Sequence, residues 1–486
     1  MLTKQAKNQH LLWRCGFGIA ANEIIPSNSA NTKELYSEIE NRSSKEPEYF
    51  DVASNEFKDI FSGIKSVADI QDIQKNISAD QKKQIRIQSQ EDLKSLTLAW
   101  LDNMVNSDAQ LREKMSLFWH GHFACRVINI YYQQLLLQDV RKNALGNFGE
   151  LLKAVSKSAS MLQFLNNQQN HKQHPNENFA REVMELFTLG RGNYTEQDVK
   201  EAARAFTGWG FTINGEFIFR PFFHDNGRKT FLGKKGNFDG EDILNILLQQ
   251  KQTAFFITKK IYKYFVNEQV DDTHVQWLAG RFYQSNYDIK GLMKDIFTAD
   301  WFYDEKNVAQ KIKSPVELLV GIRRLLPMQI ENAQIQILFQ RVLGQLLFYP
   351  PNVAGWPGGR SWIDSSSLMV RLRIPQLITD NSDFSIKPKA DDDQQMGMKE
   401  NLEKIKPNNK GAFQINAAID WNKYFTAFNQ VPKDELYNSI ESVVLQTKRG
   451  SVNKTAVMGM INNSSREEYI KTTTIALMST PEYQLC

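Results

Sequence analysis

The feature that most constrains this fold is the helical spacing of apolar residues, which is clearest in the stretch His171–Phe206. The apolar residues of its first half recur three or four positions apart: Phe179, Val183, Leu186 and Phe187. This spacing predicts a helix with one buried face. Gly190 and Gly192 predict where that helix ends, because glycine adopts the left-handed cap without strain. Thr195, with Asp198 three residues later, predicts the capping box of a second helix.

The same predicted helix carries a polar stripe that suits a functional site. Residues three and four positions apart share a helix face, and the stripe consists of Asn178, Arg181, Glu182 and Glu185. We expect the two carboxylates and Arg181 to take part in catalysis. Asn178 is expected to contact a substrate. The alternative is a buried network of satisfied ion pairs that only fixes how the helices meet.

Two histidines in the segment FWHGHF are candidate metal ligands. On a helix, His120 and His122 would point roughly 200° apart and could not share a metal ion. In an extended segment both would project from one face, and Gly121 between them permits a helix end. The alternative is that both imidazoles are hydrogen-bonded members of an aromatic wall.

The clearest β signal surrounds Asn214-Gly215, which predicts a hairpin near Phe211 to Phe219. A polar loop follows, with His224 as a candidate metal ligand, Asp225 as a candidate acid–base group and Arg228 as a candidate anion-binding group. A solvated turn of ordinary polar residues explains the same pattern.

A proline- and glycine-rich loop runs from Tyr349 to Gly359. Such a loop can line or cover a cleft, with Trp356 and Trp362 as apolar walls that bind substrate. A large structural turn is the alternative.

Length and composition bound the remaining choices. The 486 residues are 41% hydrophobic and 23% charged, with a net charge of +4, so electrostatics give no case for nucleic acid. We expect a mainly α protein: a large multi-helix domain with a small β-hairpin insertion, over residues 1–380. Residues 381–411 are predicted to form a polar linker or surface loop, and residues 412–486 to form accessory helices. No apolar run is long enough to span a membrane and the N-terminus has no hydrophobic leader segment, so a cytoplasmic location is the default expectation.

Several segments in order resemble one bacterial protein family. They are HLLWRCGFG, FWHGHF, PNENFAREVMELFTLG, YTEQDV, ARAFTGW, HDNGRKTFLG and PPNVAGWPGG, with Trp362 and Arg371 after them. The chain is similar over about residues 8–375 to the family called domain of unknown function 1800, although Phe187 stands where many relatives have a histidine. The resemblance implies no established activity. It does imply a partner, because members are often encoded beside a family related to alkaline phosphatases and sulfatases.

The sequence leaves two functional hypotheses open. In the first, a hydrolase-like or lyase-like enzyme acts on an anionic or glycan-type substrate, with or without one divalent metal ion (zinc, manganese or iron). Its metal ligands and catalytic groups would come from His120, His122, His224, Glu182, Glu185 and Asp225. Arg181 and Arg228 would hold an anionic group. In the second, the protein is a non-catalytic binding or assembly partner of a phosphatase/sulfatase-like protein. Convergence of the three imidazoles on one pocket would favour the enzyme.

Overall fold

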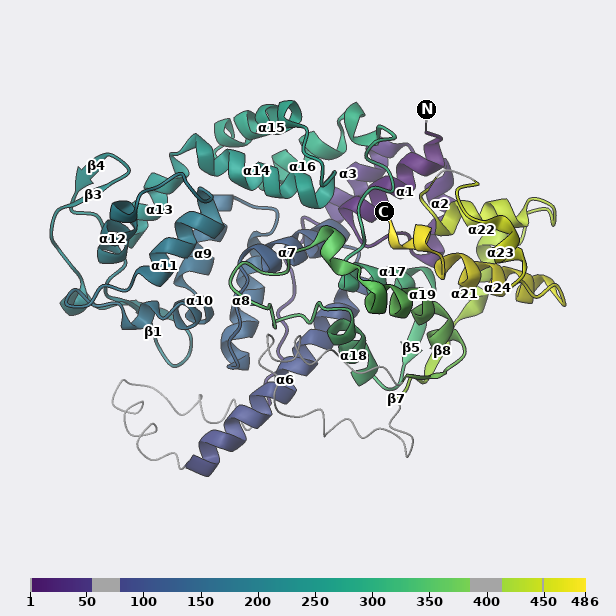
Figure 1. Ribbon diagram of the computed structural model, residues 1–486, viewed down its shortest axis with the longest axis horizontal. Helices are drawn as coiled ribbons and strands as arrows, with labels where there is room; N and C mark the ends of the chain where they lie inside the picture. The colour runs from purple at the N-terminus through teal and green to yellow at the C-terminus, as the bar shows by residue number, and fades with distance from the viewer. Residues whose placement is uncertain (1, 55–78, 385–412, 448–449) are drawn as a thin grey trace.

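The computed structural model describes residues 2–54, 79–384, 413–447 and 450–486, and it is built mainly from α-helices (Figure 1). The predicted fold class is therefore confirmed. The described strands form four separate two-stranded antiparallel pairs, where the sequence predicted a single hairpin. Residues 385–411 of the predicted linker lie outside the described residues.

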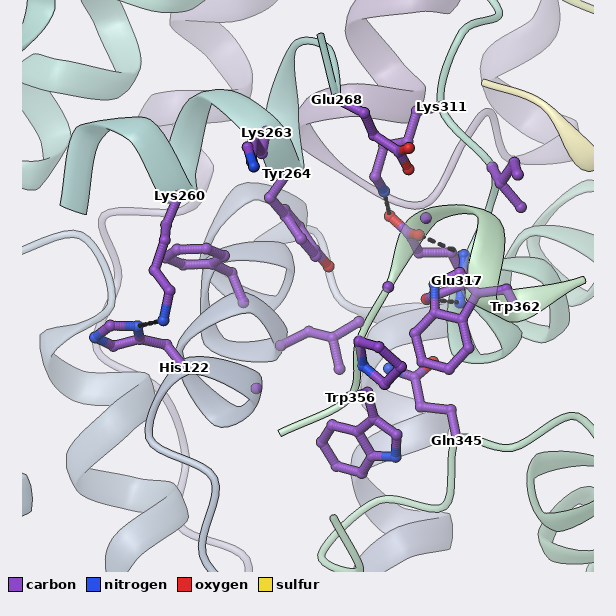
Figure 2. Close-up of a pocket in the computed structure, with 18 of the residues that line it drawn as sticks. His122, Lys260, Lys263, Tyr264, Glu268, Lys311, Glu317, Gln345, Trp356 and Trp362 are labelled. Carbon is purple, nitrogen blue, oxygen red and sulfur yellow. Dashed lines mark hydrogen bonds and ion pairs between the residues drawn. The ribbon is translucent and has the colours of Figure 1, made fainter. Parts of the chain in front are cut away.

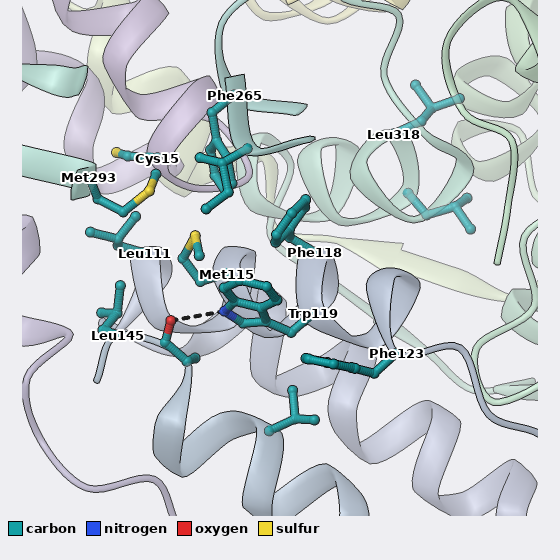
Figure 3. Packing of buried hydrophobic residues seen from close by; sticks show 14 of the residues in the cluster. Cys15, Leu111, Met115, Phe118, Trp119, Phe123, Leu145, Phe265, Met293 and Leu318 are labelled. Atoms are coloured by element: carbon teal, nitrogen blue, oxygen red, sulfur yellow. Dashed lines mark hydrogen bonds between the residues drawn. The ribbon is translucent and has the colours of Figure 1, made fainter. Parts of the chain in front are cut away.

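The helices before the hairpin surround a central helix, α7. They are α1 (Lys4–Cys15), α2 (Ile24–Ser29), α3 (Thr32–Arg42), α6 (Ala79–Asn106), α7 (Gln110–His122), α8 (Ile130–Asn143), α9 (Phe148–Lys157) and α10 (Ala159–Phe164). All but one of the residues of α7 are buried, so it packs against neighbours on every side. Figure 3 shows Met115, Phe118 and Trp119 of α7 within the core. The Trp119 indole N–H donates to the Ala144 carbonyl at 3.1 Å, which satisfies its polar atom inside the apolar core.

The stretch His171–Phe206 forms two helical segments, and the first of them ends in a π-helix. Helix α11 (Glu177–Glu182) continues directly into the π-helix η3 (Val183–Thr188), and α12 (Glu196–Ala205) follows after a turn. The Thr195–Asp198 capping box is confirmed, as is a left-handed glycine at the turn, where Gly190 has φ +80°. The π-helix was not predicted, because one wide turn leaves the buried face of the pattern unchanged.

The predicted hairpin is confirmed as β1 (Trp209–Phe211) paired with β2 (Phe217–Phe219). The Thr212 N–H donates to the Glu216 carbonyl at 2.8 Å, so the ladder continues one pair beyond the strands. Gly215 then turns the chain at φ +82°. A second hairpin, β3 (Lys229–Phe231) with β4 (Lys234–Gly236), escaped prediction. Its turn places Leu232 at positive φ, a residue type that gives no turn signal in a sequence.

The later helices pack back on the first ones. They are α13 (Gly240–Leu248), α14 (Lys251–Phe265), α15 (Asp272–Gln284), α16 (Ile289–Phe297), α17 (Pro315–Leu325), α18 (Gln334–Val342), α19 (Ser365–Thr379), α21 (Trp421–Phe425), α22 (Leu436–Val444), α23 (Lys454–Met458) and α24 (Arg466–Met478). Pro315 begins α17 as its position in the sequence suggests.

Short strands join the C-terminal segment to the rest of the chain. Strand β5 (Met328–Ile330) pairs with β8 (Ala417–Ile419), and β6 (Asp383–Phe384) pairs with β7 (Phe413–Gln414). Helix α24 packs against α19, and in Figure 1 α21 to α24 lie at one end of the molecule, beside the chain's N-terminal helices. One apolar cluster contains buried residues from both α1 and α24, so residues 413–486 share their core with the larger part.

Candidate ligand pocket

A pocket of about 440 Å³ lies where α7, α14, the start of α17 and the proline- and glycine-rich loop meet (Figure 2). Trp356 and Trp362 line it, and we call it the Trp356 pocket. The loop sits directly on α7, because a Cβ on Gly355 would lie 2.3 Å from the Gly121 carbonyl oxygen. Only glycine permits that approach at the φ of +79° found there. Gly355 therefore lets the loop that carries the tryptophan wall lie against α7.

Cationic side chains outnumber carboxylates in the lining of the Trp356 pocket. The ionisable side chains other than histidine and tyrosine are Lys260, Lys263, Lys311, Arg360, Glu268 and Glu317. Lys260 and Lys263 lie on the same side of α14 as Tyr264, because residues three and four apart share a helix face. The excess of cations favours an anionic ligand.

One end of the pocket is a buried ion-pair centre on Glu317. This carboxylate caps α17 by accepting the Ser314 N–H at 2.7 Å. It also pairs with the Lys114 ammonium group at 2.5 Å and with the Lys311 ammonium group. Burial by itself raises the pKa of Glu317, but the two cations outweigh burial and hold its pKa far below the usual range. Glu317 is thus ionised, and its carboxylate oxygens are engaged by the two ammonium groups and the helix cap.

The other end of the pocket holds a lysine–histidine pair. The Lys260 Nζ donates to His122 Nδ1 at 3.0 Å and to the Leu186 carbonyl at 3.2 Å. His122 Nε2 lies 3.3 Å from the Phe187 carbonyl, and donation there assigns the proton to Nε2 and leaves Nδ1 as an acceptor. Both carbonyls belong to the π-helix η3, whose wider turn presents them to α7 and α14.

Burial lowers the pKa of both members of this pair. The pKa of His122 lies well below its ordinary value because of burial, with the neighbouring Lys260 as a second cause. Burial lowers the pKa of Lys260 to about 8. A lysine with a lowered pKa in a pocket is a candidate for chemistry.

Two polar atoms at the pocket have no protein partner among the described residues. They are the hydroxyl group of Tyr264 and the indole N–H of Trp356. Burial raises the pKa of Tyr264 well above its usual value, so the hydroxyl keeps its proton. Buried polar atoms are nearly always hydrogen-bonded in folded proteins. Both are therefore available to a bound ligand.

The structure separates the three histidines that the sequence proposed as metal ligands. His122 lines the pocket, on a helix that continues through both histidines of FWHGHF. His120 lies in an aromatic wall of Trp100, Phe348 and Trp356, where its Nε2 accepts the Phe348 N–H at 3.1 Å. Burial lowers its pKa to about 3. Within the described ranges, no three residues among the histidines, cysteines, aspartates and glutamates form a group that could hold a metal ion.

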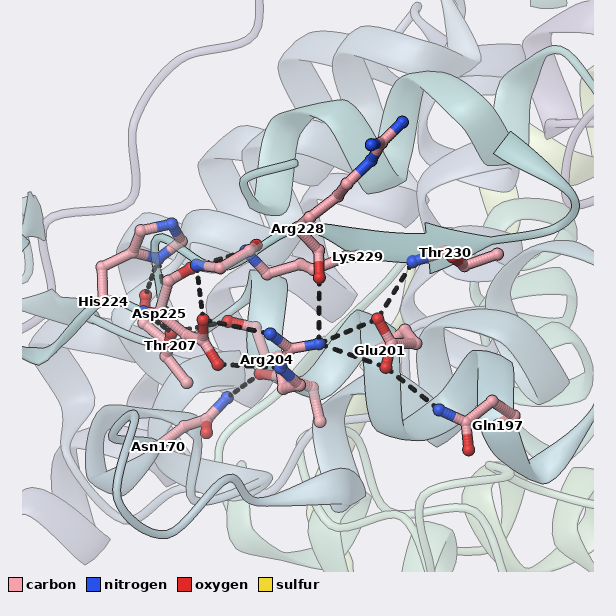
Figure 4. Close-up of polar contacts among 12 residues, drawn as sticks. Asn170, Gln197, Glu201, Arg204, Thr207, His224, Asp225, Arg228, Lys229 and Thr230 are labelled. Carbon is pink, nitrogen blue, oxygen red and sulfur yellow. Dashed lines mark hydrogen bonds and ion pairs between the residues drawn. The ribbon is translucent and has the colours of Figure 1, made fainter. Parts of the chain in front are cut away.

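His224 and Asp225 belong to a separate polar group, the Arg204 cluster, which consists of Glu201, Arg204, Thr207, His224, Asp225 and Lys229 (Figure 4). The His224 Nδ1 donates to the Thr207 carbonyl at 2.9 Å. The Arg204 guanidinium holds Asp225 with two hydrogen bonds, at 2.8 and 3.2 Å, and binds Glu201 at 3.0 Å. These bonds to Arg204 lower the pKa of Asp225. Arg228 is exposed, and its side chain points away from the cluster.

The polar stripe of α11 faces outward, away from the Trp356 pocket. Arg181 pairs with Glu196 at 2.8 Å and with Glu177 at 3.1 Å. Glu185 accepts from the Tyr194 hydroxyl and from Arg191, both at 2.6 Å, and these bonds lower its pKa.

The other two members of the stripe also lie outside the lining. Glu182 is half-buried, and burial raises its pKa. Asn178 is exposed. The segment with the predicted polar stripe thus does contribute to the pocket. Its contribution is the backbone carbonyls of Leu186 and Phe187, which accept hydrogen bonds from Lys260 and His122.

The sequence analysis did not predict four residues of the pocket lining: Lys260, Tyr264, Lys311 and Glu317. One local signal existed, since Ser314-Pro315-Val316-Glu317 has the form of a capping box. It marked a helix start and not a pocket. The lysines of α14 gave no signal, because a lysine beside an apolar stripe is ordinarily a solvated residue.

The comparisons with known proteins identify a family. Residues 10–485 match the model of the family described as protein of unknown function (DUF1800), and the chain belongs to that family. No curated protein and no solved structure matches the chain. Within the part of the chain that the structure describes, no helix is both long and apolar enough to cross a lipid bilayer.

Proposed function

We propose that this DUF1800 protein is a lyase-like enzyme that acts on an anionic, carbohydrate-type substrate in the Trp356 pocket. The observation that carries the proposal is the meeting of two tryptophans in one pocket with Lys263 and Arg360, which form no ion pair among the described residues. Perturbed titratable groups inside a cleft are a physical mark of enzyme sites.

The lining supplies both kinds of contact that such a substrate needs. An indole ring offers a flat apolar face to the C–H groups of a sugar ring, and its N–H can donate to a hydroxyl. Lys263 and Arg360 are exposed at the pocket and can bind a carboxylate, phosphate or sulfate group. The Tyr264 hydroxyl, which has no hydrogen-bond partner among the described residues, adds a donor to the same lining.

The groups present suit proton transfer better than hydrolysis by two carboxylates. Glu317 is committed to two ammonium groups and a helix cap, so the lining leaves Glu268 as its single uncommitted carboxylate among the described residues. Lys260 can accept a proton in its neutral form, and Tyr264 can donate one. Abstraction of a proton next to a carboxylate or carbonyl group, followed by elimination, requires such a pair. No step of the proposed reaction uses a metal ion, because the three histidines that the sequence predicted as metal ligands lie apart.

The test is binding of a matched panel of sugars, measured by isothermal titration calorimetry. Glucuronate, glucose 6-phosphate and glucose 6-sulfate are compared with glucose. We expect at least one anionic sugar to bind at least tenfold more tightly than glucose. Lys263→Met and Trp356→Ala should each weaken that binding at least fivefold, whereas Lys259→Met, on α14 but outside the lining, should not. Equal binding of glucose and the anionic sugars, or loss in Lys259→Met alone, would contradict the proposal.

A second candidate role, docking of a phosphatase/sulfatase-like protein, is favoured by one surface. Around β2 the side chains of Phe219 and Phe222 are 43% and 74% exposed, and Lys172 lies 5.0 Å above the Phe222 ring. Exposed aromatic groups beside cations are common in protein interfaces. Co-elution of such a protein from the same organism with the wild type, and not with Phe222→Ser, would support this role.

A further inference from the structure

We infer that Lys260 is an amine nucleophile that forms an imine with the carbonyl carbon of an anionic aldehyde or 2-oxo acid. The inference rests on the proposed function for its substrate class, since it names the covalent step within the same pocket. It goes further in assigning a nucleophile and the electrophile that this nucleophile requires.

The hydrogen bonds of Lys260 fit a neutral amine. A neutral lysine amine has two N–H bonds and one lone pair. Its two acceptors are His122 Nδ1 at 3.0 Å and the Leu186 carbonyl at 3.2 Å. Both N–H bonds are thus used, and the lone pair is left for attack. The third N–H of the charged form has no hydrogen-bond acceptor among the described residues, and Nζ lies 5.0 Å from the centroid of the Phe256 ring.

His122 acts as a positioning residue. Its Nε2–H is held by the Phe187 carbonyl, so Nδ1 is fixed toward Lys260 as an acceptor. The chain of carbonyl, imidazole and amine has the order of an orienting group, a base and a nucleophile in covalent enzymes. The turn of η3 provides the carbonyls at both ends of this chain, and π-helical turns are frequent at functional sites.

Other buried lysines near the pocket either pair with a carboxylate or lie outside the lining. Lys114 and Lys311 pair with Glu317. Burial lowers the pKa of Lys313 to about 7, but Lys313 lies between the rings of Trp13 and Tyr483, 3.7 Å from each centroid, and does not line the pocket. Among the described residues no carboxylate forms an ion pair with Lys260, and burial alone lowers its pKa, to about 8. Roughly a tenth of the amine is therefore neutral at pH 7.

The step balances without any oxidant or reductant. The Lys260 lone pair attacks the carbonyl carbon and forms a C–N bond. The carbonyl oxygen takes up two protons, one from Nζ and one from solvent, and leaves as water, so that a protonated C=N bond remains. The imine nitrogen can then withdraw electrons from the neighbouring C–C or C–H bond, which is how amine catalysis cleaves bonds next to a carbonyl group. The anionic end of the compound would face Lys263 and Arg360.

The test uses glyoxylate, the smallest aldehyde with a carboxylate, together with cyanoborohydride, which reduces an imine to a stable secondary amine. Peptide mapping by mass spectrometry then measures N-carboxymethylation of each lysine. Lys263 is the internal control, because it lines the same pocket and is exposed. At pH 7 we expect Lys260 to be modified at least tenfold faster than Lys263, with a rate that saturates with glyoxylate. An anionic sugar that binds should slow this reaction.

Two variants test whether the fast modification depends on Lys260. Lys260→Met should remove the fast modification while its circular dichroism spectrum stays that of the wild type. Lys259→Met should change neither. Equal rates at Lys260 and Lys263 would overturn the inference, and intact sugar binding in that experiment would leave the proposed function standing. Loss of both the selective modification and the sugar binding would contradict both.

Discussion

The Trp356 pocket and the Arg204 cluster are both polar, and they differ in how their charges are paired. In the Arg204 cluster the guanidinium binds two carboxylates, and Glu201 also accepts the Thr230 N–H at 3.0 Å. In the pocket, Lys260 has no carboxylate partner among the described residues, and the Tyr264 hydroxyl and Trp356 indole N–H have no protein partner. Both regions carry segments that resemble family motifs.

This difference separates a structural network from a site that can bind. A satisfied cluster has no hydrogen-bonding capacity left for a ligand, and removing one member leaves its former partners unsatisfied. A pocket with unpaired donors gains those hydrogen bonds when a ligand enters. Under the proposed function, charge pairing distinguishes the two regions better than the number of polar residues does. The α11 stripe, rich in charge but paired, shows the same rule.

The largest effect is expected from Glu317→Gln. The substitution leaves the Lys114 and Lys311 ammonium groups buried without a carboxylate, and breaking a buried ion pair typically costs about 3–5 kcal/mol. Urea denaturation measures the free energy of unfolding. Asp225→Asn in the Arg204 cluster is the control, with a loss of about 1–2 kcal/mol because that pair is partly exposed. Similar losses in the free energy of unfolding in both variants would contradict the difference between the buried Glu317 pairs and the partly exposed Arg204 cluster.

The second prediction uses the pH dependence of the free energy of unfolding to test the lowered pKa of Lys260. Its pKa is about 8 in the folded protein and about 10.5 in the unfolded chain. Between these values the unfolded chain binds more protons, so the free energy of unfolding rises with pH in that window. Lys260→Met should remove this rise, which amounts to about 3 kcal/mol at most. Denaturation curves at pH 7.5 and pH 10 measure it, with Lys259→Met as the control. Parallel changes in all three proteins would show that Lys260 is charged in the folded state.

Gly355→Ala should disturb the tryptophan wall by a smaller amount. The new Cβ would lie 2.3 Å from the Gly121 carbonyl oxygen, so the loop must move away from α7. We expect a loss of about 1–3 kcal/mol and weaker sugar binding. Gly192→Ala is the matched control, since Gly192 also has positive φ but an added Cβ meets nothing within 4 Å. Its cost should be about 1 kcal/mol. Identical behaviour of the two variants would mean that the contact with α7 does not hold the loop.

The smallest effect is expected from Arg181→Gln. Exposed ion pairs contribute little because water screens them, and Arg181 pairs with Glu196 and Glu177 at the surface. The melting temperature should stay within about 2 °C of the wild type, and the affinity for anionic sugars should be unchanged. A large loss of sugar binding would move the candidate site to the α11 stripe.

The amino-acid sequence by itself determined the features that depend on neighbours along the chain. Helical class follows from apolar residues three and four apart. The capping box at Thr195, the helix start at Pro315 and the first hairpin follow from residues within a few positions of one another. The same local evidence drew attention to His122, Trp356 and Trp362, all of which line the pocket.

Only the tertiary structure decided which of these groups meet. His122 and Lys260 are 138 positions apart and come together only because α7, α14 and a π-helical turn pack side by side. His120, two residues from His122, enters an aromatic wall instead. The physical reason is that a polar side chain's role depends on its burial and its partners. Both are set by contacts between distant segments, which local spacing does not encode.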